Sequence, residues 1–147
     1  MASRALQLET IRLDSFAPFG TVIDWGPELE ASGRPFHILM RSEAPTGWRL
    51  AVLKVASRAV GRMEHHPDTE ELFAPVSGTS VILVAEPGEW DPNGVRAFLL
   101  NRPVSLARGV WHGNMTLSDQ STILIAENLD VTGVRVDLEE PIVAALG

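Results

Sequence analysis

The sequence predicts an all-β protein, a small antiparallel β-barrel or sandwich formed by a single domain over residues 1–147. Three observations support this prediction. Short apolar runs rich in β-branched residues recur at intervals of roughly 8–12 residues, with Gly and Pro between them. A chain of 147 residues can bury one substantial core but is too short for two ordinary domains. No internal repeat, low-complexity tract or interdomain linker divides it.

The expected elements alternate between short strands and loops. A turn over residues 13–20 leads into the first strand, and residues 26–34 and 87–94 have the composition of surface loops. One or two helical turns are expected over residues 139–146. Strands are expected at residues 21–25, 36–41, 49–55, 72–76, 81–85, 95–100, 104–106, 121–126 and, as an edge strand, 134–138.

Composition excludes several classes of protein. The chain is 45% apolar and 21% charged, as in soluble globular proteins, and no apolar run approaches the roughly 20 residues that span a bilayer. The first residues lack the unbroken apolar stretch of a signal peptide. The absence of cysteine excludes disulfides and thiolate ligands, so a cytoplasmic location is expected. The net charge of −7 and the scattered basic residues argue against nucleic-acid binding.

One stretch, Gly61 to Gly78, concentrates the polar chemistry of the chain. In an extended strand alternate side chains share a face, so Glu64 and His66 are expected to point the same way. The turn signal Pro67-Asp68 follows and could fold the chain back as a hairpin. Such a hairpin would bring Glu71 to the other two side chains.

A fourth candidate, His112, lies some forty residues later in the sequence Arg-Gly-Val-Trp-His. With Glu64, His66 and Glu71 it forms a set of two imidazoles and two carboxylates. Such donors suit a divalent Mn, Fe, Ni, Co or Zn ion. Open coordination positions could bind a 2-hydroxy acid through its carboxylate and hydroxyl groups. The alternative is a charged surface hairpin with a histidine packed beneath it.

The spacing of these residues resembles the two motifs of the cupin superfamily. Glu64-x-His66 is followed by four residues, Glu71, six residues and Gly78, with Glu64 standing where the family has its first histidine. The second motif is matched by Ala107-x-Gly109-x-x-His112, with alanine in place of proline. The resemblance implies a cupin-type barrel, the double-stranded β-helix.

Further elements resemble one branch of that superfamily, the ureidoglycolate lyases. They occur in the family's order over about residues 13–126: Phe16-x-Pro18-Phe19-Gly20, Glu64-His65-His66-Pro67, Phe73-x-Pro75, Arg96-Ala97-Phe98 and Gly109-Val110-Trp111-His112. Three departures stand out. His65 replaces an arginine, Glu71 replaces a glutamine, and Gly113-Asn114-Met115 replaces His-Pro-Leu at the expected mouth of the pocket.

The resemblance implies a carbon–nitrogen lyase that splits ureidoglycolate into glyoxylate and urea in allantoin breakdown, assisted by a divalent cation, in a homodimer. Glu64, Glu71 and His112 are then the expected catalytic residues. His66, His112 and one glutamate would hold the cation, while the other glutamate would act as the base. Which glutamate takes which role stays open.

Other side chains have competing interpretations. Arg96 and Arg41 could clamp a substrate carboxylate, and Trp111 could roof the site. Arginines on a small barrel are more often solvated, and a tryptophan more often fills the core. His65 is expected to point away from the pocket.

Two rival functions stay open beside the lyase. One is a metal-dependent lyase, hydratase or isomerase acting on another small hydroxy- or keto-acid, which the altered Gly113-Asn114-Met115 segment favours. The other is a non-catalytic cupin that binds a small acid.

Overall fold

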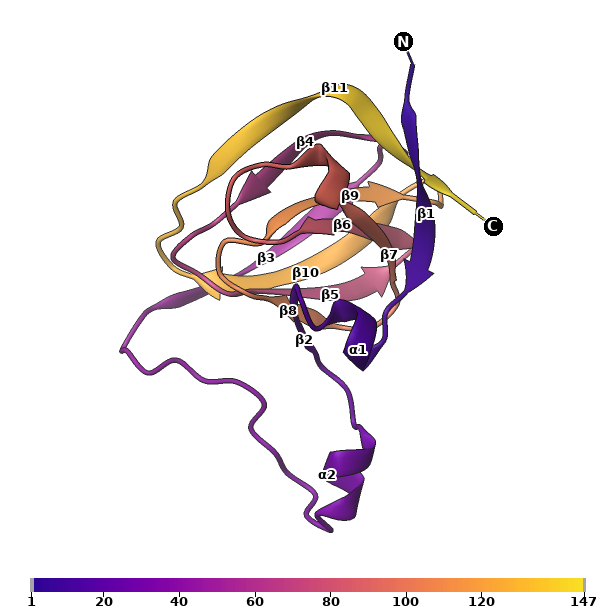
Figure 1. The fold of residues 1–147 in the computed structure, drawn as a ribbon. Coiled ribbons are helices and arrows are strands. Elements are labelled where there is room, and N and C mark those ends of the chain that lie inside the picture. Colours follow the sequence, from indigo (N-terminus) through magenta and orange to yellow (C-terminus); the bar gives the residue numbers. More distant parts are fainter. Residues whose placement is uncertain (1, 147) are drawn as a thin grey trace.

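The computed structural model describes residues 2–146, which form two β-sheets (Figure 1). Six strands close into a barrel in the order β1-β11-β4-β9-β6-β7. They are β1 (Arg4–Thr10), β4 (Val60–His65), β6 (Ser80–Ala85), β7 (Arg96–Leu100), β9 (Trp111–Thr116) and β11 (Val134–Ala145).

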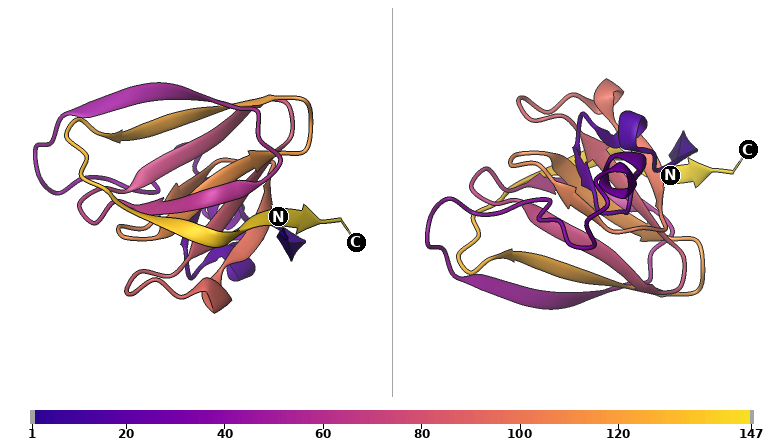
Figure 2. Two further views of the ribbon diagram at one scale, coloured as in Figure 1. Left: turned by 90° about the horizontal axis from the view of Figure 1, so that it is seen from above. Right: turned by 90° about the horizontal axis from the view of Figure 1, so that it is seen from below.

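The other five strands form a second sheet in the order β2-β8-β5-β10-β3. They are β2 (Gly20–Val22), β3 (Trp48–Val55), β5 (Glu71–Ser77), β8 (Val104–Leu106) and β10 (Ser121–Asn128). Viewed from above, β3 and β10 form one layer, and β11 lies on the side opposite them (Figure 2). The all-β fold expected from the sequence is confirmed, as a closed barrel with a second sheet.

In the part of the chain that the structure describes, helical structure is limited to three short segments: α1 (Leu13–Phe16), α2 (Pro27–Ala31) and the 3₁₀ turn η1 (Pro92–Gly94). Two of them begin with proline, whose fixed φ suits the first helical position. Within residues 2–146, no helix has the length and apolar character needed to cross a membrane.

The expected helical turns over residues 139–146 are wrong, because β11 continues as a strand to Ala145. The N-terminal strand β1 lies alongside this segment and pairs Arg4 with Ile142 in parallel. It also pairs in parallel with β7, so the barrel is not wholly antiparallel. Pro141 is tolerated because the β11–β4 register breaks between Asp137 and Ile142. Backbone pairing on both sides of β11 therefore outweighs the helical signal.

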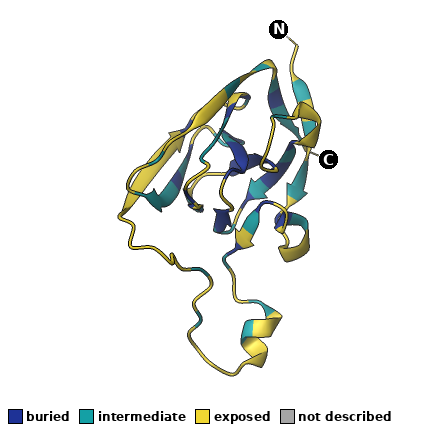
Figure 3. Ribbon diagram, turned by 60° about the vertical axis from the view of Figure 1, so that its left-hand side comes forward, coloured by how far each residue is buried: buried dark blue, intermediate teal, exposed yellow. Residues whose placement is uncertain are grey.

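The strand expected at residues 36–41 is also wrong. This segment belongs to an arm that projects from the two sheets together with α2 (Figures 1 and 3). No strand lies beside it, and Phe36 and Ile38 are 77% and 66% exposed. Its alternating apolar pattern therefore has no partner strand among the described residues.

Two apolar clusters fill the molecule. The first contains a group of three phenylalanines, in which the Phe98 ring meets Phe16 and Phe19 edge-on at centroid distances of 5.1 and 5.9 Å. The second lies inside the barrel around Met63 and Met115, both fully buried. The first cluster takes side chains from both sheets and so fixes them against each other, whereas the second packs the barrel strands alone.

Candidate metal centre

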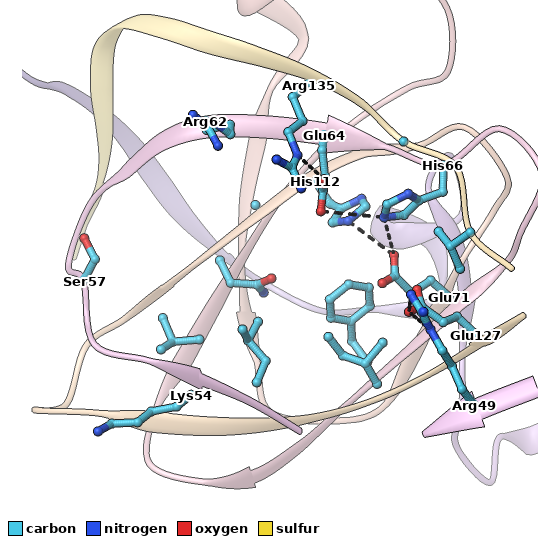
Figure 4. Close-up of a pocket in the computed structure, with 18 of the residues that line it drawn as sticks. Arg49, Lys54, Ser57, Arg62, Glu64, His66, Glu71, His112, Glu127 and Arg135 are labelled. Carbon is cyan, nitrogen blue, oxygen red and sulfur yellow. Dashed lines mark hydrogen bonds and ion pairs between the residues drawn. The ribbon is translucent and has the colours of Figure 1, made fainter. Parts of the chain in front are cut away.

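A cavity of about 980 Å³ lies between the inner faces of the two sheets, and most of the ionisable side chains discussed above line it (Figure 4). Each sheet contributes one row of side chains from three neighbouring strands. The chemistry of the site follows from how these rows face each other.

The row on the barrel sheet runs across β11, β4 and β9. Glu64 lies directly opposite His112 on one side and Arg135 on the other. Arg135 Nε donates a hydrogen bond to Glu64 Oε2 at 3.1 Å. Glu64 keeps a third of its side chain exposed, whereas His112 is buried.

The row on the second sheet runs across β5, β10 and β3. Glu127 lies opposite Arg49, and Glu71 comes one position beyond the Leu72–Ala126 pair, which places it beside Glu127. Arg49 contacts Glu127 Oε2 through Nη2 at 2.7 Å and through Nε at 2.9 Å. The side chains of Glu71 and Glu127 are 7% and 8% exposed.

The two histidines between these rows have fixed orientations. Nδ1 of His66 lies 2.9 Å from the carbonyl oxygen of Thr132, and Nδ1 of His112 lies 3.1 Å from that of Val110. A carbonyl oxygen can only accept, so each Nδ1 carries the proton. Each Nε2 therefore presents a lone pair to the cavity, as in metal-ligating histidines.

Both lone pairs face one carboxylate oxygen. Glu71 Oε1 lies 3.3 Å from His112 Nε2 and 3.7 Å from His66 Nε2, and it is buried without a hydrogen-bond partner. Acceptor facing acceptor in a buried site is unfavourable unless a proton or a cation lies between them. This arrangement is the strongest local indication of a cation site.

Electrostatics lead to the same conclusion. Burial raises the pKa of Glu71 to about 9, with the hydrogen bond to Glu127 and the charges of Glu127 and Glu64 adding to the effect against the opposing Arg49. Burial lowers the pKa of His112 to about 4. When all three glutamates are ionised, their negative charges outnumber the positive charges of the two arginines that pair with them, Arg49 and Arg135. His112 is neutral and adds no positive charge. A divalent cation would offset the excess negative charge.

Two groups of three donors are compact enough to hold such an ion. The donor atoms of Glu64, His66 and His112 lie within 4.8 Å of one another, as do those of His66, Glu71 and Glu127. Imidazole nitrogen with carboxylate oxygen suits Mn, Fe, Co, Ni or Zn. The residues therefore fit a divalent cation, and the donors do not single out one metal.

Comparison with known proteins places the chain in a family. The family model for ureidoglycolate lyase matches residues 29–145. The chain belongs to the ureidoglycolate lyase family. The ureidoglycolate lyase of Brucella anthropi is 32% identical over 95% of this chain and 90% of its own length. That of Burkholderia cepacia is 34% identical over 73% of this chain and 70% of its own.

Among solved structures, a dTDP sugar isomerase from Desulfovibrio desulfuricans matches with a TM-score of 0.49 and 19% identity, over 68% of this chain and 73% of that one. The family assignment rests on the sequence comparisons and does not depend on this match.

The structure brings together the four residues that the motifs single out, Glu64, His66, Glu71 and His112. The expected hairpin, however, is wrong. Strand β4 pairs with β9 and β11, whereas β5 pairs with β8 and β10, so the Pro67-Asp68 turn crosses from one sheet to the other. The four side chains meet because the two sheets that carry them face each other across the cavity.

The three residues expected to contact the substrate lie outside the cavity. Arg96 is bound to Glu9 through two hydrogen bonds of 2.9 and 2.6 Å. Arg41 sits on the projecting arm, where it pairs with Glu43. Trp111 is buried, and its ring stacks on that of His65 at a centroid distance of 4.1 Å. His65 thus faces away from the cavity, as expected from the strand alternation.

Several cavity residues escaped the sequence reasoning, and those that pair with the motif residues or lie beside them are Arg49, Glu127 and Arg135. The signal for Glu127 was present in the alternation of β10, where Ile123 is buried and Ile125 packs against the same core. Continuing that period places Glu127 on the inner face. No comparable pattern marks the two arginines.

The segment that departs from the family pattern does border the cavity. Gly113 and Asn114 line it, whereas Met115 is buried in the barrel core. A Cβ on Gly113 would lie 2.8 Å from Val60 Cγ1 and 3.2 Å from the carbonyl oxygen of Arg62. The close approach of β4 to β9 therefore depends on glycine at this position.

Proposed function

We propose that this chain is a ureidoglycolate lyase that splits ureidoglycolate into glyoxylate and urea, assisted by a divalent cation. Membership in the family supports the reaction. The observation that carries the site is the buried Glu71 Oε1, which lies between the lone pairs of His66 and His112. These three residues would hold the cation.

When bound, the cation would supply positive charge to the substrate carboxylate and to the oxygen that becomes the carbonyl of glyoxylate. The two histidines keep their Nε2 atoms aimed at one point, because backbone carbonyls hold the opposite ring nitrogens.

The structure favours Glu64 over Glu71 as the base. Its side chain is one-third exposed to the cavity, whereas Glu71 is buried between the histidines. Arg135 contacts only one of its oxygens, Oε2, at 3.1 Å. The other oxygen, Oε1, is free of the guanidinium and lies 3.7 Å from His66 Nε2, and it would be available to take a proton.

The reaction needs one proton transfer in each direction. Glu64 takes the proton of the substrate hydroxyl, and the electron pair of that O–H bond forms the carbonyl of glyoxylate. The C–N bond breaks with its electrons moving to the urea nitrogen. The same carboxyl group then returns the proton to that nitrogen, so no water is consumed.

The test is release of glyoxylate from ureidoglycolate by the purified protein, before and after chelation and metal add-back. We expect chelation to abolish turnover and a divalent ion to restore it. Glu64→Gln should bind the metal but be inactive, while Glu70→Gln, at an exposed neighbouring carboxylate, should behave as the parent. Turnover unaffected by chelation would show that no cation is needed for the reaction. Full activity of Glu64→Gln would show that Glu64 is not the base.

A second candidate is a lyase, hydratase or isomerase acting on another small hydroxy- or keto-acid. The observation that favours it is the position of Gly113 and Asn114 on the cavity wall, where the sequence departs from the family pattern. A panel of small acids with the metal-loaded protein would distinguish the two, since turnover of a different acid with none of ureidoglycolate would select this candidate.

We also propose that the chain forms a homodimer through the outer face of β3. Trp48, Leu50 and Val52 alternate along this edge strand and are 69%, 58% and 72% exposed, and Val76 on β5 is 61% exposed. Apolar side chains gathered on one face are typical of an interface. Light scattering should give twice the chain mass, and Val52→Lys should lower it. A single-chain mass at all concentrations would contradict this proposal.

A further inference from the structure

We propose that Glu127 is a ligand of the cation, so that His66, His112, Glu71 and Glu127 bind it and Glu64 is left free for proton transfer. This inference rests on the proposed cation site. Glu127 belongs to neither of the motifs that mark the other residues, and it reaches the site from β10, on the sheet opposite to Glu64.

The first support is the cross-strand arrangement of Glu71 and Glu127. They are neighbours on adjacent strands with their side chains on one face, and both are more than nine-tenths buried. When both are ionised, two carboxylates directly opposite each other destabilise a sheet. Arg49 forms its ion pair with Glu127 and not with Glu71, so the two neighbouring carboxylates have the charge of one guanidinium between them. A cation held by both glutamates would remove this repulsion.

The second support is that Arg49 contacts only one of the two carboxylate oxygens of Glu127. Both contacts from Arg49 go to Oε2, at 2.7 and 2.9 Å. Oε1 is thus free of the guanidinium, while the group as a whole is held in place. A metal-bound carboxylate whose second oxygen accepts a hydrogen bond is the usual arrangement in proteins. Arg49 is therefore the positioning residue for this ligand.

The third support is donor geometry. The donor atoms of His66, Glu71 and Glu127 lie within 4.8 Å of one another, and Glu71 Oε1 is buried there without a partner. Glu64 forms a similar group with the histidines, but a third of its side chain is exposed, whereas Glu127 is 8% exposed. An ionised carboxylate is costlier the more deeply it is buried, even beside one arginine, so a cation would stabilise the protein more through Glu127 than through Glu64.

The experiment measures Mn²⁺ affinity by calorimetry and the d–d absorption spectrum after Co²⁺ loading, using chelator-treated full-length protein. Glu127→Gln should weaken Mn²⁺ binding by about tenfold or more and alter the Co²⁺ spectrum. Glu64→Gln should keep the affinity within about threefold and leave the spectrum unchanged. Glu70→Gln is the matched surface control. Glu127→Asp keeps the charge and covers the case in which the glutamine variant fails to fold; it should show an intermediate affinity.

Three results would overturn the inference. An unchanged affinity and spectrum in Glu127→Gln would exclude a ligand role. A weaker affinity with an unchanged Co²⁺ spectrum would show that Glu127 only positions other ligands. Loss of the Co²⁺ spectrum in Glu64→Gln instead would make Glu64 the ligand. Turnover of ureidoglycolate by the parent protein, measured on the same preparation, separates this question from the proposed reaction.

Discussion

Replacing Glu71 with glutamine is expected to stabilise the metal-free protein at alkaline pH while destroying the proposed cation site. Burial and neighbouring charge raise the pKa of Glu71 from 4.5 to about 9, so the folded state keeps a proton that the unfolded state has lost. Stability from this group is fully present below about pH 4.5 and is lost as the pH rises towards 9. Glutamine has no such dependence.

The size of the effect follows from linkage. Each pH unit between the two pKa values reduces the free energy of unfolding by at most about 1.4 kcal/mol. At about pH 8 the difference between the variant and the parent is therefore at most about 5 kcal/mol, and at about pH 5 it is below about 1 kcal/mol. His112, whose pKa is lowered to about 4, adds stability as the pH rises from 4 to 6.5. That contribution is common to both proteins as long as glutamine leaves the surroundings of His112 unchanged, and it then drops out of the difference.

The assay is urea denaturation of chelator-treated protein followed by fluorescence of the four tryptophans, at several pH values between 5 and 8. Glu70→Gln provides the matched control, because that carboxylate is exposed. A Glu71→Gln protein that is no more stable than its parent at pH 8 would refute the electrostatic account of the site. Adding Mn²⁺ should stabilise the parent and leave the variant nearly unchanged.

Three further outcomes are expected. Gly113→Ala should lower the free energy of unfolding by about 1–3 kcal/mol in urea titration, since its Cβ would lie 2.8 Å from Val60 Cγ1, and an unaltered midpoint would contradict this. Phe98→Ala, at a fully buried ring, should cost about 3–5 kcal/mol in the same measurement, and a loss below 1 kcal/mol would be inconsistent with the packing. Arg135→Met should reduce kcat roughly ten- to a hundredfold by releasing Glu64, with Mn²⁺ affinity preserved and partial rescue by Arg135→Lys; equal loss of both would argue against a positioning role.

Much of the architecture was predictable from local pattern. The β-branched run at residues 81–85 and the apolar run at 121–126 are central strands in the structure, because their periodicity matches burial in a sheet. The four motif residues meet as the spacing indicates, although the route differs from a hairpin. Period and spacing report which face a side chain takes, but they do not report which sheet a strand joins.

The remaining features depend on contacts that a linear pattern does not contain. Residues 36–41 have a strand-like alternation but find no partner strand among residues 2–146, and residues 139–145 become a strand because β1 and β4 lie alongside. Glu127 and Arg49 are far apart in the sequence and become a pair only through the register of β10 on β3. Side chains such as Arg96 and Trp111 have the right chemistry for a binding site but lie elsewhere in the fold.

The proposed ligands come from both sheets, with His112 on β9 of the barrel and Glu71 on β5 of the other layer. A cation bound there would act as a cross-link between the two layers in a chain that has no cysteine to form a covalent one. Separation of the layers would then require release of the ion, so the unfolding rate would depend on metal occupancy. Loss of the metal would thus make the protein more susceptible to inactivation by heat and proteolysis, in addition to abolishing the proposed activity.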